Sequence, residues 1–423
     1  MKRITHKYIP ERNNVMRAYE RLLNYVVVRT PSDANSTTIP STPCQFDLAH
    51  LLVKELKELG LSDAYVDDKC YVYAHLPATP GYENKAKLGL IAHMDTVTEF
   101  CDHEIRPVIT ENYDGNPLPL GTSGRTLSPD HIKVLNSLIG RTLITTDGTT
   151  ILGADDKAGI AEIMTVLERL VKENIPHGPL SIGFTPDEEI GAGANHFNHK
   201  EFNADFAYTI DGDTEGSIEY ENFNACHAVF EIDGINVHPG AAKDTMINAI
   251  LVATEINSLL PAGQTPRDTE GYDGFYHLEK FVGDISHVRM DYIIRDHNKD
   301  SFNERKRILR EIEKAMKEKW GEKFITLTIK DEYCNMAEII TQHMHLIENA
   351  KKACQNLGIT PRISPIRGGT DGAQLSYDGL PCPNLGTGAH AVHGPYEFVT
   401  TEGMDLATEI ALEIVKLYAD INL

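Results

Sequence analysis

The sequence has few cysteines, and none of them has the spacing of a thiolate metal site. Its seven cysteines lie far apart along the chain, their number is odd, and no Cys-x-x-Cys pair occurs. We therefore expect neither a disulfide framework nor a zinc site built from thiolates. The pattern is typical of a reducing compartment.

Long apolar runs are also missing. No run approaches the roughly 18 apolar residues that a membrane-spanning helix needs. The basic start, MKRITHKYIPERNN, lacks the apolar segment of a secretory signal. These features predict a cytoplasmic protein.

Positive charge is scarce as well. The 40 Lys and Arg residues are outnumbered by 62 Asp and Glu, which gives a formal net charge of -22. Nucleic acid and anionic membrane surfaces both attract clustered positive charge, so neither is expected as a partner. Bound divalent cations would offset part of the excess.

The chain of 423 residues is too long for one ordinary core, so we expect two domains. Strands alternate with helices up to about residue 221 and again from 336 to 423. This order predicts an α/β domain with a mostly parallel mixed sheet flanked by helices. Helices are expected over residues 13–27, 46–59, 244–260, 301–318, 340–357 and 402–418, and after the motif GADDK.

Two segments differ from this pattern. Residues 222–335 give the order β-α-β-β-α-β, which predicts an inserted ferredoxin-like α+β domain. Residues 101–150, rich in Gly, Pro, Asn and Asp, are expected to be irregular, with a strand pair near GRTLITTDG.

Acidic residues and histidines follow five predicted strands. They are His93 and Asp95 after LGLIA, Asp155 and Asp156 after TTILGA, Asp187, Glu188 and Glu189 after LSIGFTP, Asp211 after FAYTI, and His393 after LGTGAHAV. Open parallel sheets bind ligands beyond the carboxyl ends of their strands. We therefore expect these side chains to converge on one site.

Such a cluster of carboxylates requires a counter-charge, which two divalent ions would supply. Imidazole and carboxylate ligands without thiolates suit Zn²⁺, with Mn²⁺ or Co²⁺ as substitutes. Two ions about 3.5–4 Å apart share a bridging carboxylate. We expect Asp155 to be the bridge, His93 and Asp211 to complete one ion, and Glu189 and His393 to complete the other.

The adjacent pair of glutamates then has two roles. Neighbouring residues of an extended chain point in opposite directions, so one glutamate can bind metal while the other faces the water. Glu188 is expected to be the general base. Asp95 is expected to accept the second ring N–H of His93 and so to fix its tautomer.

Each motif taken alone is more typical of an ordinary structural residue. A histidine near a strand end is usually capped or solvated, and we assign His343, His345 and His390 to that class. Asp156 suits a helix N-cap. Five such motifs with metal-compatible residues favour a site.

The motifs AHMDTV, GADDKAGIAEI, PDEEIGAGA, YTIDGD and GAHAVHGPYEFV resemble the co-catalytic dizinc exopeptidases, the family that includes carboxypeptidase G2, dipeptidases and aminoacylases. From about residue 10 to the end, inserted domain included, the chain is similar to the aminotripeptidase branch of that family. The resemblance implies two Zn²⁺ per chain, the ligand roles given above, tripeptides as substrates and a homodimer, with residues 222–335 as the lid or dimerisation domain.

The resemblance also implies three further roles. His238 in NVHPG matches a histidine that reaches the reacting carbonyl, and Arg367 in RGGTDG matches an arginine that pairs with the terminal carboxylate of the substrate. Arg295 in IIRDH would assist Arg367. A guanidinium suits a carboxylate, but a structural ion pair is the alternative for both arginines.

The chain departs from the family after Asp211, where DGDTEGSIEY replaces a glycine-rich turn. The added Asp213 and Glu215 either hold the substrate ammonium or belong to a solvated loop. Two other functions stay open: a dipeptidase, deacylase or carboxypeptidase of the same fold, and a non-catalytic metal- or peptide-binding module. Glu188 argues against the module, because a binder does not need a base beside its ligand.

Overall fold

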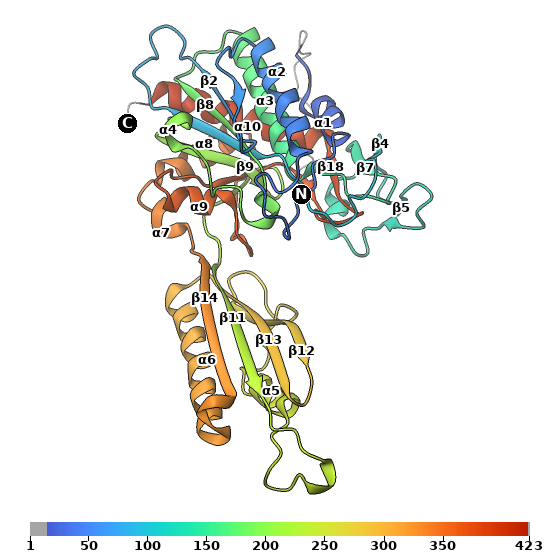
Figure 1. The fold of residues 1–423 in the computed structure, drawn as a ribbon. Helices are drawn as coiled ribbons and strands as arrows, with labels where there is room; N and C mark the ends of the chain where they lie inside the picture. The colour runs from blue at the N-terminus through green and yellow to red at the C-terminus, as the bar shows by residue number, and fades with distance from the viewer. Residues whose placement is uncertain (1–14, 422–423) are drawn as a thin grey trace. The chain divides into compact units, whose positions relative to one another are not determined.

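The computed structural model describes residues 15–421, which form two compact units. The first unit runs to Glu219 and resumes over Ile339–Ile363 and from Thr370 (Figure 1). The second contains Tyr220–Glu338 and Ser364–Gly369. The basic start of the chain lies outside the described residues. Within residues 15–421, none of the helices combines the length and the apolar character needed to cross a bilayer.

An eight-stranded mixed sheet forms the centre of the first unit. In spatial order its strands are β1 (Tyr65–Val66), β2 (Val72–Leu76), β8 (Leu180–Thr185), β3 (Leu88–His93), β9 (Phe206–Gly212), β16 (Asn384–Gly386), β10 (Ser217–Glu219) and β15 (Arg362–Ile363). The four central strands, from β8 to β16, run parallel to one another. The predicted mostly parallel mixed sheet is confirmed.

Helices cover this sheet on both faces. On one face lies α3 (Ala154–Lys172), which packs on β3 and β9 and is in turn covered by α1 (Ala18–Val26) and α10 (Thr401–Asp420), with α8 (His345–Asn356) beside α10. On the other face, α4 (His199–Phe202) and α9 (Asp371–Tyr377) share an apolar cluster with β2, β3 and β9. Helix α2 (Gln45–Glu58) packs against β1 and β2. The expected helix over 13–27 is observed from Ala18, and residues 13 and 14 lie outside the described part.

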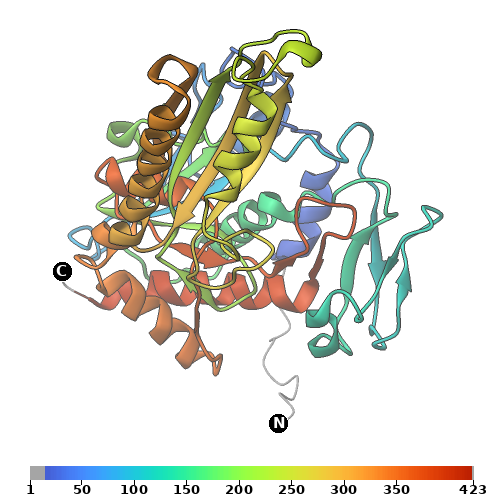
Figure 2. The ribbon, with the colours of Figure 1, turned by 90° about the horizontal axis from the view of Figure 1, so that it is seen from below.

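A second, four-stranded sheet lies in the first unit, with the order β17 (Ala389–His390), β18 (Phe398–Thr400), β7 (Leu143–Thr146) and β4 (Pro107–Thr110). Residues 101–150 are therefore more ordered than expected. They include the β5–β6 hairpin (Leu118–Pro119 and Thr126–Leu127), and Figure 2 shows this segment in teal. Its apolar side chains form a small core that Phe398 joins. The prediction of a strand at TTILGA is wrong, because β7 ends at Thr146 and residues 147–153 form no strand.

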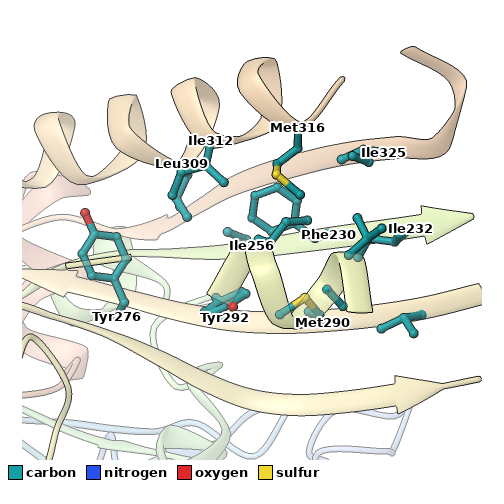
Figure 3. Packing of buried hydrophobic residues seen from close by; sticks show 14 of the residues in the cluster. Phe230, Ile232, Ile256, Tyr276, Met290, Tyr292, Leu309, Ile312, Met316 and Ile325 are labelled. Atoms are coloured by element: carbon teal, nitrogen blue, oxygen red, sulfur yellow. The ribbon is translucent and has the colours of Figure 1, made fainter. Parts of the chain in front are cut away.

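The second unit has the predicted β-α-β-β-α-β order. Its elements are β11 (Asn224–Asp233), α5 (Ala249–Ser258), β12 (Phe275–Gly283), β13 (His287–Asp296), α6 (Lys299–Trp320) and β14 (Ile325–Tyr333). The antiparallel sheet order β12-β13-β11-β14 is that of a ferredoxin-like fold. Figure 3 shows Leu309, Ile312 and Met316 of α6 packed over the sheet, with Met316 beside Phe230.

Candidate metal centre

Three neighbouring parallel strands bring most of the predicted ligands together. His93 is the last residue of β3, Asp211 lies near the end of β9, and Glu188 and Glu189 form the turn after β8. Because β8, β3 and β9 are adjacent and parallel, their carboxyl ends lie at the same edge of the sheet. The expected convergence of these four residues follows from this topology.

Asp155 and His393 reach the same place from the smaller sheet. The loop after β7 leads to Asp155, which lies at the start of α3 with a non-helical backbone, and His393 follows β17. The expectation that all five segments follow strands of one sheet is therefore wrong for these two. The residues nevertheless meet the others.

The carboxylate of Asp155 lies between two imidazoles. Its Oδ1 is 2.9 Å from His93 Nε2, and its Oδ2 is 3.1 Å from His393 Nε2. Asp211 Oδ1 lies 3.6 Å from His93 Nε2, and Glu189 Oε2 lies 3.1 Å from His393 Nε2. One carboxylate shared by two His–carboxylate pairs is the arrangement expected for a bridged pair of metal ions.

These residues fit divalent cations. Ligand atoms of His93, Asp155 and Glu189 lie within 4.8 Å of one another. The second oxygen of Glu189, Oε1, is buried and has no hydrogen-bond partner among the described residues. A buried carboxylate oxygen without a partner is costly, and a cation would satisfy it. The set of imidazole and carboxylate donors suits Zn²⁺, Mn²⁺ or Co²⁺.

Asp156 also lies in this cluster, within 4.8 Å of ligand atoms of His93 and Asp211. Its two carboxylate oxygens, however, accept hydrogen bonds from the backbone N–H groups of His93 (3.1 Å) and Gly159 (3.3 Å). Asp156 therefore ties the start of α3 to the end of β3. This contact favours the structural role expected for it.

The pKa shifts in the cluster show excess negative charge. Burial would lower the pKa of the His93 imidazole, but its hydrogen bonds to the Asp155 and Asp211 carboxylates outweigh burial and hold this pKa well above its ordinary value. Desolvation, and then the Asp211 carboxylate, raise the pKa of Glu188 well above its usual range. Carboxylates in such surroundings bind protons or cations to relieve their repulsion. Divalent ions would return Glu188 toward its ionised form.

Asp95 connects His93 with the glutamate pair. Its Oδ1 is 3.3 Å from His93 Nδ1, which also lies 3.1 Å from the Asp95 backbone oxygen. Its carboxylate accepts hydrogen bonds from the backbone N–H groups of Glu188 (2.9 Å) and Glu189 (3.1 Å). The glutamates lie in a 3₁₀ turn, η2 (Glu188–Ile190), not in an extended chain. Their side chains diverge because successive residues of such a turn are about 120° apart.

Asp187, the residue before the glutamates, was expected in the cluster but was assigned no role of its own from the sequence. Asp187 has a left-handed backbone, with φ 59°. Its buried carboxylate accepts hydrogen bonds from the backbone N–H of Ser41 (2.7 Å) and from Gln45 Nε2 (2.7 Å). These bonds anchor the glutamate turn to the start of α2. Ser41 and Gln45 are more than 140 positions away, so no local pattern pointed to them.

His238, Arg295 and Arg367 belong to the second unit. His238 is exposed, and its Nδ1 accepts a hydrogen bond from Gly240 N (3.1 Å), so the ring proton of the neutral imidazole lies on Nε2. Arg295 forms an ion pair with Glu332 at 3.0 Å. This contact matches the structural ion pair that was given as the alternative to substrate binding. Arg367 donates to the backbone oxygens of Gly271 (2.8 Å) and Asp273 (3.0 Å).

Of the two added acidic residues, Glu215 is engaged in a structural ion pair. Its Oε1 lies 2.6 Å from Arg141 Nη1, and that guanidinium also contacts Thr400 Oγ1 at 3.2 Å. Asp213 is exposed in the loop after β9 and lies 4.0 Å from Arg362. The contacts of Glu215 favour a structural role over recognition of the substrate amine.

Replacing Glu215 with glutamine is therefore expected to lower stability without changing substrate binding. Loss of a charged hydrogen bond at this mostly buried pair should cost about 1–3 kcal/mol of unfolding free energy. The KM for an unblocked tripeptide should stay the same, because Arg141 occupies the carboxylate. Denaturant unfolding and steady-state kinetics measure both quantities. A large rise in KM with unchanged stability would assign Glu215 to the substrate amine instead.

Comparison with known proteins identifies the family of the chain. The model of peptidase family M20/M25/M40 matches residues 147–417. A protein called Peptidase T from Caldanaerobacter subterraneus subsp. tengcongensis is 51% identical over 401 residues, covering 94% of this chain and 98% of that protein.

Two solved structures share the fold. A tripeptidase from Staphylococcus aureus superposes with a TM-score of 0.77 at 23% identity, covering 97% of this chain and 100% of its own. A dinuclear metal binding peptidase of family M20 from Bacillus subtilis gives a TM-score of 0.59 at 15% identity, with 95% and 99% covered. The family match and the close relative lead to one conclusion: the chain belongs to peptidase family M20/M25/M40.

Proposed function

We propose that the chain is a metal-dependent aminopeptidase that releases the N-terminal residue of tripeptides. The observation that carries the proposal is the Asp155 carboxylate, whose two oxygens each face one imidazole, with Glu188 on the adjoining turn. The relative named Peptidase T, 51% identical over nearly its whole length, supports tripeptides as the substrate class.

The residues that would hold the metals are the ones predicted from the sequence. His93, Asp155 and Asp211 would bind one ion, and Asp155, Glu189 and His393 the other; Zn²⁺ is the proposed metal. Metal ions held there would supply Lewis acidity to the scissile carbonyl and would lower the pKa of the attacking water toward ~7.

The side chains of the protein then transfer the protons and hold the groups that exchange them. Glu188 takes a proton from the attacking water and passes it to the leaving amine. Asp95 fixes Glu188 by accepting its backbone N–H (2.9 Å) and fixes the ring of His93 on the same carboxylate. A base held in this way is already positioned when the substrate arrives.

Three further residues would complete the proposed mechanism. We assign the catalytic domain to residues 1–221 and 336–423, except that Ser364–Gly369 group with the second unit, and a lid or dimerisation domain to residues 222–335. His238 would donate its Nε2–H to the oxyanion. This N–H is available because Gly240 N donates to the other ring nitrogen, Nδ1. Arg367, assisted by Arg295, would bind the terminal carboxylate of the substrate. A cytoplasmic homodimer is part of the same proposal.

A panel of three peptides tests the proposal. The metal-loaded protein is incubated with a free tripeptide, the same tripeptide N-acetylated, and the corresponding dipeptide. We expect rapid release of the first residue from the free tripeptide alone. Faster cleavage of the dipeptide would indicate a dipeptidase, and cleavage of the acetylated peptide a deacylase or carboxypeptidase of the same fold. Either result would overturn the aminotripeptidase assignment.

A further inference from the structure

Glu397 is a buried carboxylate that accepts three backbone hydrogen bonds. Its side chain is 2% exposed. Oε2 accepts the N–H groups of Leu152 (2.7 Å) and Gly153 (2.8 Å), and Oε1 accepts the N–H of Asp155 (3.1 Å). These bonds join residues more than 240 positions apart, and the turn they hold leads directly into the bridging ligand.

The residue before the helix contributes no side chain to this turn. Helix α3 begins at Ala154, and its N-cap is Gly153, with φ 73° and no side chain to accept a hydrogen bond. The free N–H groups at the start of a helix are normally satisfied by a capping side chain. Asp155 and Asp156 are non-helical, and Asp156 Oδ1 accepts the N–H of Gly159 (3.3 Å), as a cap of the following helix does. The carboxylate of Glu397 accepts the N–H groups of the turn before it, and a negative charge is favourable near this end of a helix.

Glu397 also belongs to the segment that carries His393. Three residues lie between the two, and the chain turns there, since the backbone N–H of Glu397 donates to the backbone oxygen of Gly394 (3.1 Å). Directly after Glu397 comes β18, which pairs with β7, the strand that precedes the Asp155 turn. One carboxylate therefore joins the two ligand-bearing loops that come from the smaller sheet.

We propose that Glu397 is a positioning residue of the metal centre, which fixes Asp155 and His393 relative to each other before metal binds. The inference rests on the proposed function, because it takes these two residues to be metal ligands. Groups that orient metal ligands typically contribute about 10–100-fold to metal affinity. A purely structural Glu397 would stabilise the fold and leave the affinity of the folded protein unchanged.

The test is the Glu397→Gln variant, with Glu162→Gln as its matched control. Glutamine keeps the shape but has one acceptor oxygen, so an NH₂ group must face at least one of the three N–H donors. Glu162 is a fully buried glutamate of α3 whose oxygens have no hydrogen-bond partner in the described part of the chain. The two substitutions make the same chemical change at buried sites.

The readout is Co²⁺ binding by the metal-free protein, followed by its visible absorption. We expect Glu397→Gln to weaken Co²⁺ binding by about 10–100-fold and Glu162→Gln to leave it unchanged. A folded Glu397→Gln protein with normal affinity would overturn the inference and leave the proposed function intact. Failure of the unsubstituted protein to bind Co²⁺ would overturn the proposed function itself.

A second measurement needs no variant. If Glu397→Gln does not fold, it tests whether the turn before Asp155 is held in the metal-free protein. In the metal-free protein, hydrogen exchange at the amides of Leu152, Gly153 and Asp155 should be slow, because all three are bonded to Glu397. Exchange as fast as in an open loop would show that the turn is not held before metal binds, which contradicts the inference.

Discussion

Replacing Glu188 with glutamine is expected to lower kcat by about 10²–10⁴-fold, the range that a positioned general base contributes. The amide cannot take a proton from water. Metal content should remain unchanged, because the proposed ligands are other residues and the Asp95 contact to the backbone of residue 188 persists. Steady-state hydrolysis of a free tripeptide, with metal analysis of the same sample, measures both effects.

The exposed Glu111 provides the control, since Glu111→Gln makes the same change away from the metal centre. Near-normal turnover in Glu188→Gln would show that another group is the base. Loss of a metal ion in this variant would make Glu188 a ligand. A metal-loaded, unsubstituted protein that binds peptides without cleaving them would favour the alternative of a non-catalytic module.

Replacing Asp155 with alanine is expected to remove both metal binding and activity. Its carboxylate faces His93 at 2.9 Å and His393 at 3.1 Å, so one substitution takes a ligand from both ions. Because bound metal stabilises the transition state by several kcal/mol, and each 1.36 kcal/mol is tenfold in rate, kcat should fall by about 10³-fold or more. Metal content after dialysis and kcat are the measurements.

Asp102→Ala is the control for this prediction. Asp102 is an acidic residue whose side chain is 86% exposed and pairs with His103. The Asp102→Ala variant should keep normal metal content and activity. Two tightly bound ions in Asp155→Ala would contradict the bridging role, and one ion would restrict Asp155 to a single metal.

Much of the site could be predicted because its chemistry lies at the ends of three buried apolar strands. LGLIA, LSIGFTP and FAYTI are identifiable as strands from the sequence, and parallel pairing places the residues after each of these strands at one edge of the sheet. The inserted unit was predictable for a similar reason, since its alternating strands and amphipathic helices are local patterns.

The rest depends on pairing between distant segments. TTILGA has the apolar composition of a strand, but the small sheet forms from Leu143–Thr146 and Phe398–Thr400, and this pairing has no local signature. Glu397 and Asp187 act on the backbone or side chains of residues more than 140 positions away, so neither could be distinguished from an ordinary loop acid. Adjacent glutamates likewise gave no sign of a 3₁₀ turn.

Two metal ions, bridged by Asp155, should be required for cleavage of a free tripeptide. Titrating the metal-free protein with Zn²⁺ while following tripeptide hydrolysis tests it most directly. We predict that activity reaches its maximum at two equivalents of metal per chain. Full activity in the absence of bound metal, or a maximum reached at one equivalent, would contradict it.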